Sequence, residues 1–272
     1  MNALARGITE FFDLFFRPFG SAGWPSLIVI SALSGVLLLW LFKITTNQAA
    51  LSERRRLLTG HLYELGLYQD DLKSMAMIQF DLLKANLKYV STSLPALLVL
   101  LPVVLVIVVQ LDARYQRRGL QTGETALVSA TVAEGHDSVP PLLALEPGRD
   151  LVVEAGPLVD RVEGVVWWRV RAESDSTNVL NITDGTTSWP KFLHPVSAGG
   201  RLAQTREQSG WHHLCLNPTE IALPGEAPLA AITVALPRQD ADWAGLPTWL
   251  WGFFGISVIG GLLVKKLLRV EM

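Results

Sequence analysis

The sequence predicts an α-helical membrane protein with three transmembrane helices and a cytoplasmic helical hairpin, plus an inserted all-β domain of immunoglobulin-like sandwich type. Half of the 272 residues are hydrophobic, only 18% are charged, and the mean hydropathy is +0.32. Three windows, 18–42, 89–111 and 243–264, contain no Asp, Glu, Lys or Arg. Each is longer than the roughly 20 residues that span a bilayer core. This composition excludes a soluble globular enzyme and a disordered chain.

Residues 1–20 are expected to form an amphipathic helix. Phenylalanines recur at helical spacing and lie opposite charged residues such as Glu10 and Asp13. Such a helix either lies flat in the membrane interface or docks on the protein's own spans. We expect Phe11, Phe12 and Phe15 to contact partners from this helix.

The three spans are assigned to residues 21–43, 92–111 and 246–264, followed by a tail at 265–272. Small residues in the first span, Ser31 and Gly35, allow close approach of another helix. Pro95 and Pro102 lie seven residues apart in the second span, on one face, and should kink it. We predict that Pro95, Pro102, Ser31 and Ser34 shape a groove.

Residues 44–91 are predicted to form two antiparallel helices that continue from the first two spans, because leucines repeat every three to four residues. Gly66 and an expected N-cap at Asp70 mark the break between the two helices. Four basic residues lie near the membrane end of this hairpin: Lys43, Arg54, Arg55 and Arg56. They form either a solvated face or a contact for lipid head groups, an acidic partner, nucleic acid or client chains.

Basic residues indicate the orientation of the spans. The hairpin region and the tail together carry ten Lys and Arg, whereas the opposite flanks carry six. Cytoplasmic loops are enriched in Lys and Arg. We therefore expect an inner-membrane protein with its N-terminus outside, its hairpin and C-terminus inside, and its β domain outside the cytoplasm.

Two stretches of the hairpin carry a family resemblance. The first is 43–48, Lys-Ile-Thr-Thr-Asn-Gln, which leads into Arg54, Arg55 and Arg56, and the second is 68–72, Tyr-Gln-Asp-Asp-Leu. Together with the arrangement of the spans, they resemble the three-span core of the YidC/Oxa/Alb insertase superfamily. The arrangement is most similar to the archaeal small-insertase homologues and the third subunit of the endoplasmic-reticulum membrane protein complex. Two features depart from the family. No charge lies inside the charge-free windows that form the spans, and about 130 residues separate the second and third spans, where the family has a short loop.

Residues 112–245 are acidic, with 17 Asp and Glu against 11 Lys and Arg. Strand-like runs occur at 125–133, 150–154, 165–172, 179–183, 212–216 and 230–236. Asp184-Gly185 predicts a tight hairpin. With a single cysteine, Cys215, the chain cannot form an internal disulfide, so this domain depends on its hydrophobic core.

The β domain offers few candidate residues for chemistry. His213 and Cys215 face one side of a strand and His212 the other, so only two metal ligands converge, whereas zinc sites need three or four. Side chains alternate between the two faces of a strand, so one of the Trp167 and Trp168 rings lies in the core and the other lies outside it. We consider Trp168 and Trp189 as candidate partner contacts, with core packing of at least one as the alternative. No motif for a phosphate loop or a catalytic nucleophile is present, and we expect neither a cofactor nor an enzyme.

The leading functional hypothesis is an insertase-like membrane chaperone that assists insertion, folding or assembly of membrane proteins. The spans would supply a groove, and the hairpin would contact the incoming chain or the ribosome. The alternative is a structural or accessory subunit of a larger membrane complex, bound to its partner subunits through the β domain and the N-terminal helix. The expected partners are membrane lipids and other membrane proteins, with no direct nucleic-acid specificity.

Overall fold

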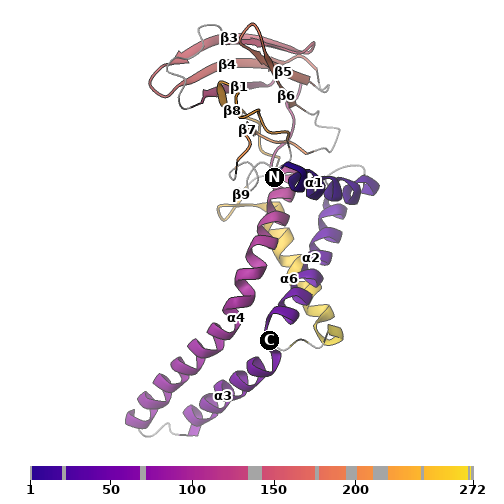
Figure 1. Ribbon diagram of the computed structural model, residues 1–272. Coiled ribbons are helices and arrows are strands. Elements are labelled where there is room, and N and C mark those ends of the chain that lie inside the picture. Colours follow the sequence, from indigo (N-terminus) through magenta and orange to yellow (C-terminus); the bar gives the residue numbers. More distant parts are fainter. Residues whose placement is uncertain are drawn as a thin grey trace. The chain divides into compact units, whose positions relative to one another are not determined.

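Within the part of the chain that it describes, the computed structural model contains three helices long and apolar enough to span a membrane: α2 (Trp24–Thr45), α4 (Leu72–Tyr115) and α6 (Thr248–Leu268) (Figure 1). Helix α4 contains the whole charge-free window 89–111, whereas α2 and α6 contain residues 24–42 and 248–264 of the other two windows. The structure describes residues 2–19, 23–67, 72–133, 143–174, 178–193, 201–210, 220–239, 242–268 and 270. A helical protein of membrane type with a β region is therefore confirmed.

The chain divides into two compact units. One comprises residues 28–105 and 252–272, and contains α3 (Gln48–Leu67) with most of α2, α4 and α6. The other comprises residues 1–27 and 106–251, and contains the N-terminal helix and the β domain.

Helices α2 and α6 pack closely where small residues meet. A methyl group added at Gly35 would overlap the backbone carbonyl of Ser257, and one added at Gly260 would lie 3.1 Å from the backbone of Ala32. Small residues allow two helix backbones to approach closely in a membrane, where apolar side chains alone provide little driving force. The expected close approach at Gly35 is thus confirmed, with α6 as the neighbour.

Helix α4 is continuous over 44 residues and passes through both Pro95 and Pro102. At 1.5 Å per residue it is about 66 Å long, roughly twice the thickness of a bilayer core. It therefore supplies both the second arm of the hairpin and the second span. The predicted kink stays a prediction.

The second unit begins with α1 (Asn2–Phe16) and the short 3₁₀ helix η1 (Arg17–Phe19). The described residues of its β domain form two larger antiparallel sheets, of order β3-β4-β1-β8-β7 and β2-β5-β6, and the short ribbon β10-β9 (Figure 1). The strands are β1 (Thr125–Val132), β2 (Ala144–Glu146), β3 (Leu151–Asp160), β4 (Val165–Ala172), β5 (Asn178–Thr183), β6 (Ser188–Leu193), β7 (Thr205–Glu207), β8 (Leu229–Val234), β9 (Asp242–Trp243) and β10 (Leu246–Pro247).

One hydrophobic core joins the two larger sheets. Val128, Val170 and Ile232 come from the five-stranded sheet, whereas Leu180 and Ile182 come from the three-stranded sheet, and all five are buried. Apolar residues on one face of each sheet pack together because each strand alternates its side chains between two faces. The β domain therefore has its own core.

Most of the predicted strands and the predicted β-hairpin at Asp184-Gly185 are present. The turn joins β5 to β6, and the Asp184 carboxylate accepts hydrogen bonds from the backbone N–H groups of Thr186 and Thr187. These bonds lower the pKa of Asp184. The expected strand at 212–216 lies outside the described residues.

Sequence reasoning missed strands β2, β6 and β7 and the two short strands β9 and β10. In β6, Pro190 and Lys191 disrupt the apolar alternation that identifies a strand. The structure tolerates Pro190 because β6 is an edge strand of its sheet. Edge strand β3 is bulged at Gly156, where φ is +121° and a methyl group would lie 2.8 Å from the Trp168 ring.

Candidate functional site

The two arms of the helical hairpin have complementary inner faces. The Arg54 guanidinium donates to the Lys88 carbonyl and lies 3.5 Å from the Ser91 hydroxyl, which fixes an antiparallel register. Buried and half-buried residues then recur every three to four positions, as in an antiparallel coiled coil. On α3 they are Leu51, Arg54, Leu58, His61 and Leu65, and on α4 they are Met75, Ile78, Leu82, Ala85 and Tyr89.

The opposite side of α4 carries an exposed apolar stripe. Phe80 is 59% exposed and Leu87 is 63% exposed, although both lie on the hairpin arm. The stripe advances by three to four residues at each step, apart from the adjacent pair Leu97 and Leu98, and covers about 42 Å of helix. Its members are Met77, Phe80, Leu83, Leu87, Val90, Leu94, Leu97, Leu98, Leu101 and Leu105. We call this set the α4 stripe.

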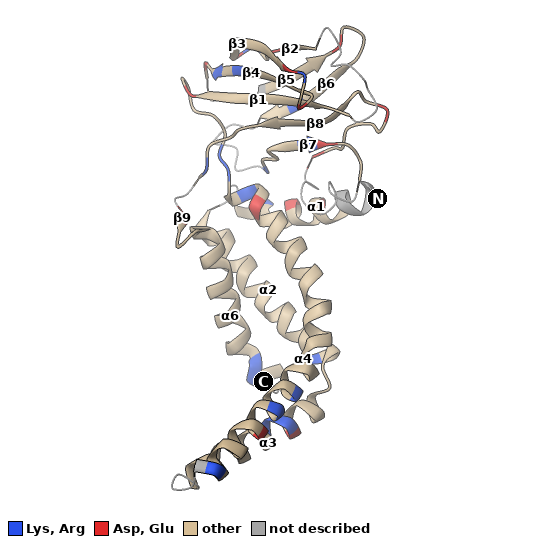
Figure 2. Ribbon diagram, turned by 90° about the vertical axis from the view of Figure 1, so that its left-hand side faces the viewer, with Lys and Arg blue, Asp and Glu red and all other residues tan. Residues whose placement is uncertain are grey.

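Basic side chains flank the hairpin, and Figure 2 shows Lys and Arg along it. Lys73, Lys84 and Lys88 lie on α4 beside the α4 stripe, and the Lys84 ammonium is 4.3 Å from the centre of the Phe80 ring. On α3, Arg55 and Arg56 are exposed. The hairpin thus combines an apolar track with a border of basic residues, two of which are paired within their own helix, Lys84 with Asp81 and Arg56 with Glu53.

The four basic residues predicted near the membrane end of the hairpin fall into two groups: two contact another helix, and two are exposed. Arg54 contacts α4 as described, and the Lys43 ammonium donates to the Leu268 carbonyl at 2.7 Å, at the end of α6. A cation favours the C-terminal end of a helix, where carbonyl groups have no helical partner. Lys43 and Arg54 therefore stabilise this unit. Arg55 and Arg56 are exposed, and Arg56 lies 3.6 Å from Glu53 of the same helix, so exposure alone makes these two the candidates for external contacts.

The four residues predicted to shape a groove also differ in exposure. Ser31 and Ser34 are buried in the helix packing, so they do not line an open groove in this structure. Pro95 and Pro102 are exposed on α4. Because proline has no N–H, each leaves one carbonyl four residues earlier without its helical hydrogen bond. A groove-shaping role for the two prolines stays a prediction.

In the other unit, a buried arginine anchors α1. The Arg114 guanidinium donates to the Gln110 carbonyl at 2.7 Å and side-chain oxygen at 2.9 Å, and to the Asp13 carboxylate at 2.5 Å. Arg201 of the β domain donates to the second oxygen of Asp13, also at 2.5 Å. The Phe16 ring centre lies 5.1 Å from Arg114, which adds a cation–π contact. Asp13 thereby connects α1 to α4 and to the β domain.

Aromatic residues extend this joint. The Tyr115 hydroxyl lies 2.8 Å from the Ser26 hydroxyl, and its ring lies 6.1 Å from Phe16 and 6.3 Å from Trp249. The Trp249 indole donates to Gln116 at 2.9 Å. Side chains from α1, α2, α4 and α6 therefore meet in one aromatic layer.

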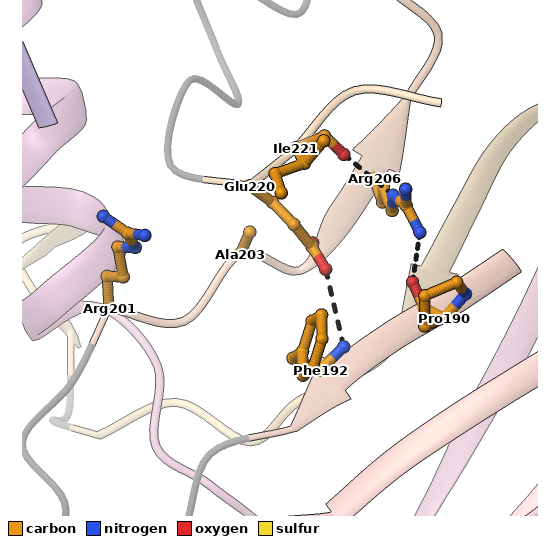
Figure 3. Close-up of a pocket in the computed structure, with 7 residues that line it drawn as sticks. All are labelled: Pro190, Phe192, Arg201, Ala203, Arg206, Glu220 and Ile221. Carbon is orange, nitrogen blue, oxygen red and sulfur yellow. Dashed lines mark hydrogen bonds between the residues drawn. The ribbon is translucent and has the colours of Figure 1, made fainter. Parts of the chain in front are cut away.

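The β domain contains a cleft of about 450 Å³, drawn in Figure 3. Arg206 holds two walls together, because its Nε donates to the Ile221 carbonyl at 2.8 Å and its Nη1 donates to the Pro190 carbonyl. Arg201 lies on the other side of the cleft (Figure 3). The lining residues are Pro190, Phe192, Arg201, Ala203, Arg206, Glu220 and Ile221.

A buried ion pair supports the cleft. Lys191 has no exposed side-chain surface, and its ammonium donates to the Ala203 carbonyl at 2.6 Å and to Glu220. Burial lowers the pKa of Lys191, while Glu220 opposes this shift. Burial also lowers the pKa of Arg206. Because Glu220 is already paired, the described lining residues favour binding of a partly apolar group over acid–base chemistry.

The two tryptophans proposed as exposed partner contacts are not at the surface. Trp168 is 2% exposed and Trp189 is 4% exposed, because both point into the shared core. That expectation was wrong, whereas the alternation across Trp167 and Trp168 is present. Trp167 is on the outer face and pairs with exposed Leu158 of β3. Together with Leu127, these residues form an exposed apolar patch on the five-stranded sheet, which we call the outer patch.

Metal ligands are not gathered in the described part of the chain, where no group of three or more His, Cys, Asp or Glu could hold an ion. His212, His213 and Cys215 fall outside that part.

The three phenylalanines predicted as partner contacts on α1 differ in exposure: Phe12 is buried, Phe15 is half-buried, and Phe11 is exposed.

Comparison with family models, with curated proteins and with solved structures gave no match for this chain.

Proposed function

We propose that this protein is an insertase-like membrane chaperone that assists insertion, folding or assembly of other membrane proteins without covalent chemistry. The observation that carries the proposal is the α4 stripe. Its apolar residues begin on the hairpin arm at Met77 and continue without a break in the helix to Leu105. The stripe offers an apolar segment of a client a continuous track from the hairpin into the bilayer.

The composition of the stripe suits varied clients. Water-exposed Met77, Phe80, Leu83 and Leu87 are costly to leave uncovered, and contiguous apolar surface of this kind is typical of binding sites. Methionine and leucine side chains adapt to partners of different shape. The occupant that fits is an apolar helical segment of a nascent membrane protein.

The charge of the hairpin supports a cytoplasmic position. Lys73, Lys84, Lys88, Arg55 and Arg56 would face anionic head groups or the ribosome there, in agreement with the excess of basic residues on this side of the spans. In this orientation the N-terminus and the β domain, a two-sheet sandwich, lie outside the cytoplasm. The architectural resemblance to the YidC/Oxa/Alb superfamily supports the same assignment.

A second candidate function is that of a fixed subunit in a larger membrane complex. The outer patch of Leu127, Leu158 and Trp167 favours it, because exposed apolar surface on a sheet face is suited to a partner protein. The absence of Asp, Glu, Lys and Arg from the three charge-free windows also agrees with a role that needs no polar intramembrane groove.

Site-specific photo-crosslinking tests the proposal. A photoreactive amino acid is placed at Phe80 or Leu87 on the stripe, and at exposed, polar Asn86 of the same helix as the matched control. We expect stripe positions to crosslink to many nascent membrane proteins, with several-fold lower yield at Asn86. Equal yields at the three positions, or crosslinks only to lipid, would contradict a client track.

A further inference from the structure

The apolar face of α1 is wider than the part that packs on the protein. Thr9, Phe12 and Phe16 are buried and form the inner row. Phe11 is 66% exposed, although it belongs to the same apolar face, and Ile8 and Phe15 beside it are only half-buried. We call Ile8, Phe11 and Phe15 the outer row. The joint with α4 therefore covers only one side of this face.

The anchoring of Asp13 determines which way the outer row points. Residues turn by about 100° per position in an α-helix, so Ile8, Phe11 and Phe15 lie about 140–160° around the axis from Asp13. Asp13 is bound to Arg201 of the β domain. The adjacent Leu202 N–H donates to the Ala113 carbonyl at 2.6 Å, which fixes this strand connection at the end of α4. The outer row consequently points away from Arg201 and its connection in the β domain.

The aromatic layer indicates how deep α1 lies relative to the membrane surface. Phe16 contacts Tyr115, which stacks on Trp249 at the start of α6. Trp24 begins α2 and is exposed, and the exposed Trp251 indole donates to the Trp243 carbonyl at 2.9 Å. Tyrosine and tryptophan at the ends of spans concentrate at the membrane–water interface. Helix α1 is in direct contact with this layer.

Charged residues of α1 lie on the side of Asp13. Glu10 and Arg17 are exposed and are within about 60° of Asp13 around the helix axis. An amphipathic helix with this division of charged and aromatic residues is suited to lie in the plane of a bilayer surface. The short link between η1 and α2 supports a position of α1 at the bilayer surface, since only residues 20–23 separate these two helices.

We propose that the outer row of α1 inserts into the lipid surface. Ile8, Phe11 and Phe15 contact the acyl chains just below the head groups, while Asp13 holds the helix to Arg114 and Arg201 from the water side. The lipid surface covers the exposed half of the apolar face, and α1 fixes the depth of the aromatic layer. The inference concerns α1 alone and is independent of the client track on α4.

Nitroxide accessibility tests this assignment in the full chain. Cys215, the single cysteine, is replaced by Ser or, as a second background, by Ala, and a spin label is attached at Phe11→Cys or Phe15→Cys. Glu10→Cys is the matched control on the same helix. The protein is reconstituted in vesicles of phosphatidylcholine and phosphatidylglycerol, and collisions with oxygen and with a water-soluble nickel chelate are measured.

We expect the ratio of oxygen to nickel collisions to be several-fold higher at positions 11 and 15 than at position 10. Equal ratios at the three positions would overturn the proposal, and so would a label at position 11 that neither reagent reaches, because that result indicates cover by protein. A measurement on the unaltered chain adds a second check. A lipid with a photoreactive acyl chain should label Phe11 and Phe15 and spare Glu10, and labelling of Glu10 alone would contradict the inference.

Discussion

The Arg114 guanidinium lies 2.5 Å from the Asp13 carboxylate, a residue 101 positions earlier in the chain. Arg114 is almost entirely buried, whereas Asp13 is 44% exposed and also binds Arg201. A buried charge without a partner is unfavourable because the protein interior solvates it poorly. Docking of α1 is therefore coupled to neutralisation of Arg114.

Asp13→Asn should release α1 more effectively than Arg114→Met. The first substitution leaves a buried positive charge without its carboxylate, while the second leaves an exposed carboxylate that still binds Arg201. We expect Asp13→Asn to weaken docking by about 1–3 kcal/mol, below the value for a fully buried pair because Asp13 is partly exposed. Hydrogen exchange of the α1 amides measures the effect. Faster exchange in Arg114→Met than in Asp13→Asn would contradict the coupling.

Gly35→Ala should destabilise the helix packing of α2 and α6. The added methyl group overlaps the Ser257 carbonyl, and overpacking of this kind costs about 1–3 kcal/mol. Gly255→Ala is the matched control, because a methyl group there has no neighbour within 4 Å. Thermal unfolding in mild detergent should show a lower midpoint for Gly35→Ala and an unchanged or higher one for Gly255→Ala. Equal midpoints would refute the close approach.

Charge reversal on the hairpin should impair client contact without unfolding the protein. Each basic residue near an anionic surface contributes about 1 kcal/mol, so the double variant Arg55→Glu, Arg56→Glu should lower the crosslinking yield at Phe80 at least tenfold. Arg54→Ala acts differently, because Arg54 contacts Lys88 and Ser91 and its loss should loosen the hairpin. An unchanged yield in the double variant would remove Arg55 and Arg56 from the site.

Acid should weaken the β domain through Glu124. The Arg118 guanidinium, which binds both carboxylate oxygens at 2.7 Å, lowers the pKa of Glu124 from 4.5 to about 2. The ionised form is therefore favoured by folding. The stabilisation is complete above the unfolded-state pKa and is lost as pH falls from about 5 to 2.

Glu124→Gln measures this contribution. The free energy of unfolding of the wild type should exceed that of Glu124→Gln by about 1 kcal/mol or less at neutral pH, since the pair is partly exposed. The difference should disappear near pH 2. A difference that stays constant from pH 7 to pH 2 would show that the ion pair is not its source.

The spans could be predicted because a charge-free window of more than 20 residues has few alternatives to a membrane helix. The β-hairpin at Asp184-Gly185 was predictable for a local reason, because Gly185 adopts a φ of +89° that other residues rarely adopt. In contrast, the contact between Asp13 and Arg114 joins distant parts of the chain. The sequence shows Arg114 only as one of several flanking arginines.

The candidate site was predictable in part. Helical spacing indicated the hairpin, but not which of its basic residues point outward, since Lys43 and Arg54 differ from Arg56 only in their tertiary neighbours. Alternation showed that one of Trp167 and Trp168 is buried, but it could not say which one. The α4 stripe was also missed, because an apolar periodicity is normally assigned to the packed face of a helix.

The central claim is that the protein receives nascent membrane proteins, and a pull-down in gentle detergent tests it most directly. The protein is isolated from cells with stalled translation and from cells without stalling, and its partners are quantified by mass spectrometry. We predict ribosomes and many different membrane proteins, enriched several-fold on stalling and reduced by Arg55→Glu, Arg56→Glu. One or two membrane proteins in equimolar amount, unaffected by stalling, would contradict the account and identify the protein as a fixed subunit of a membrane complex.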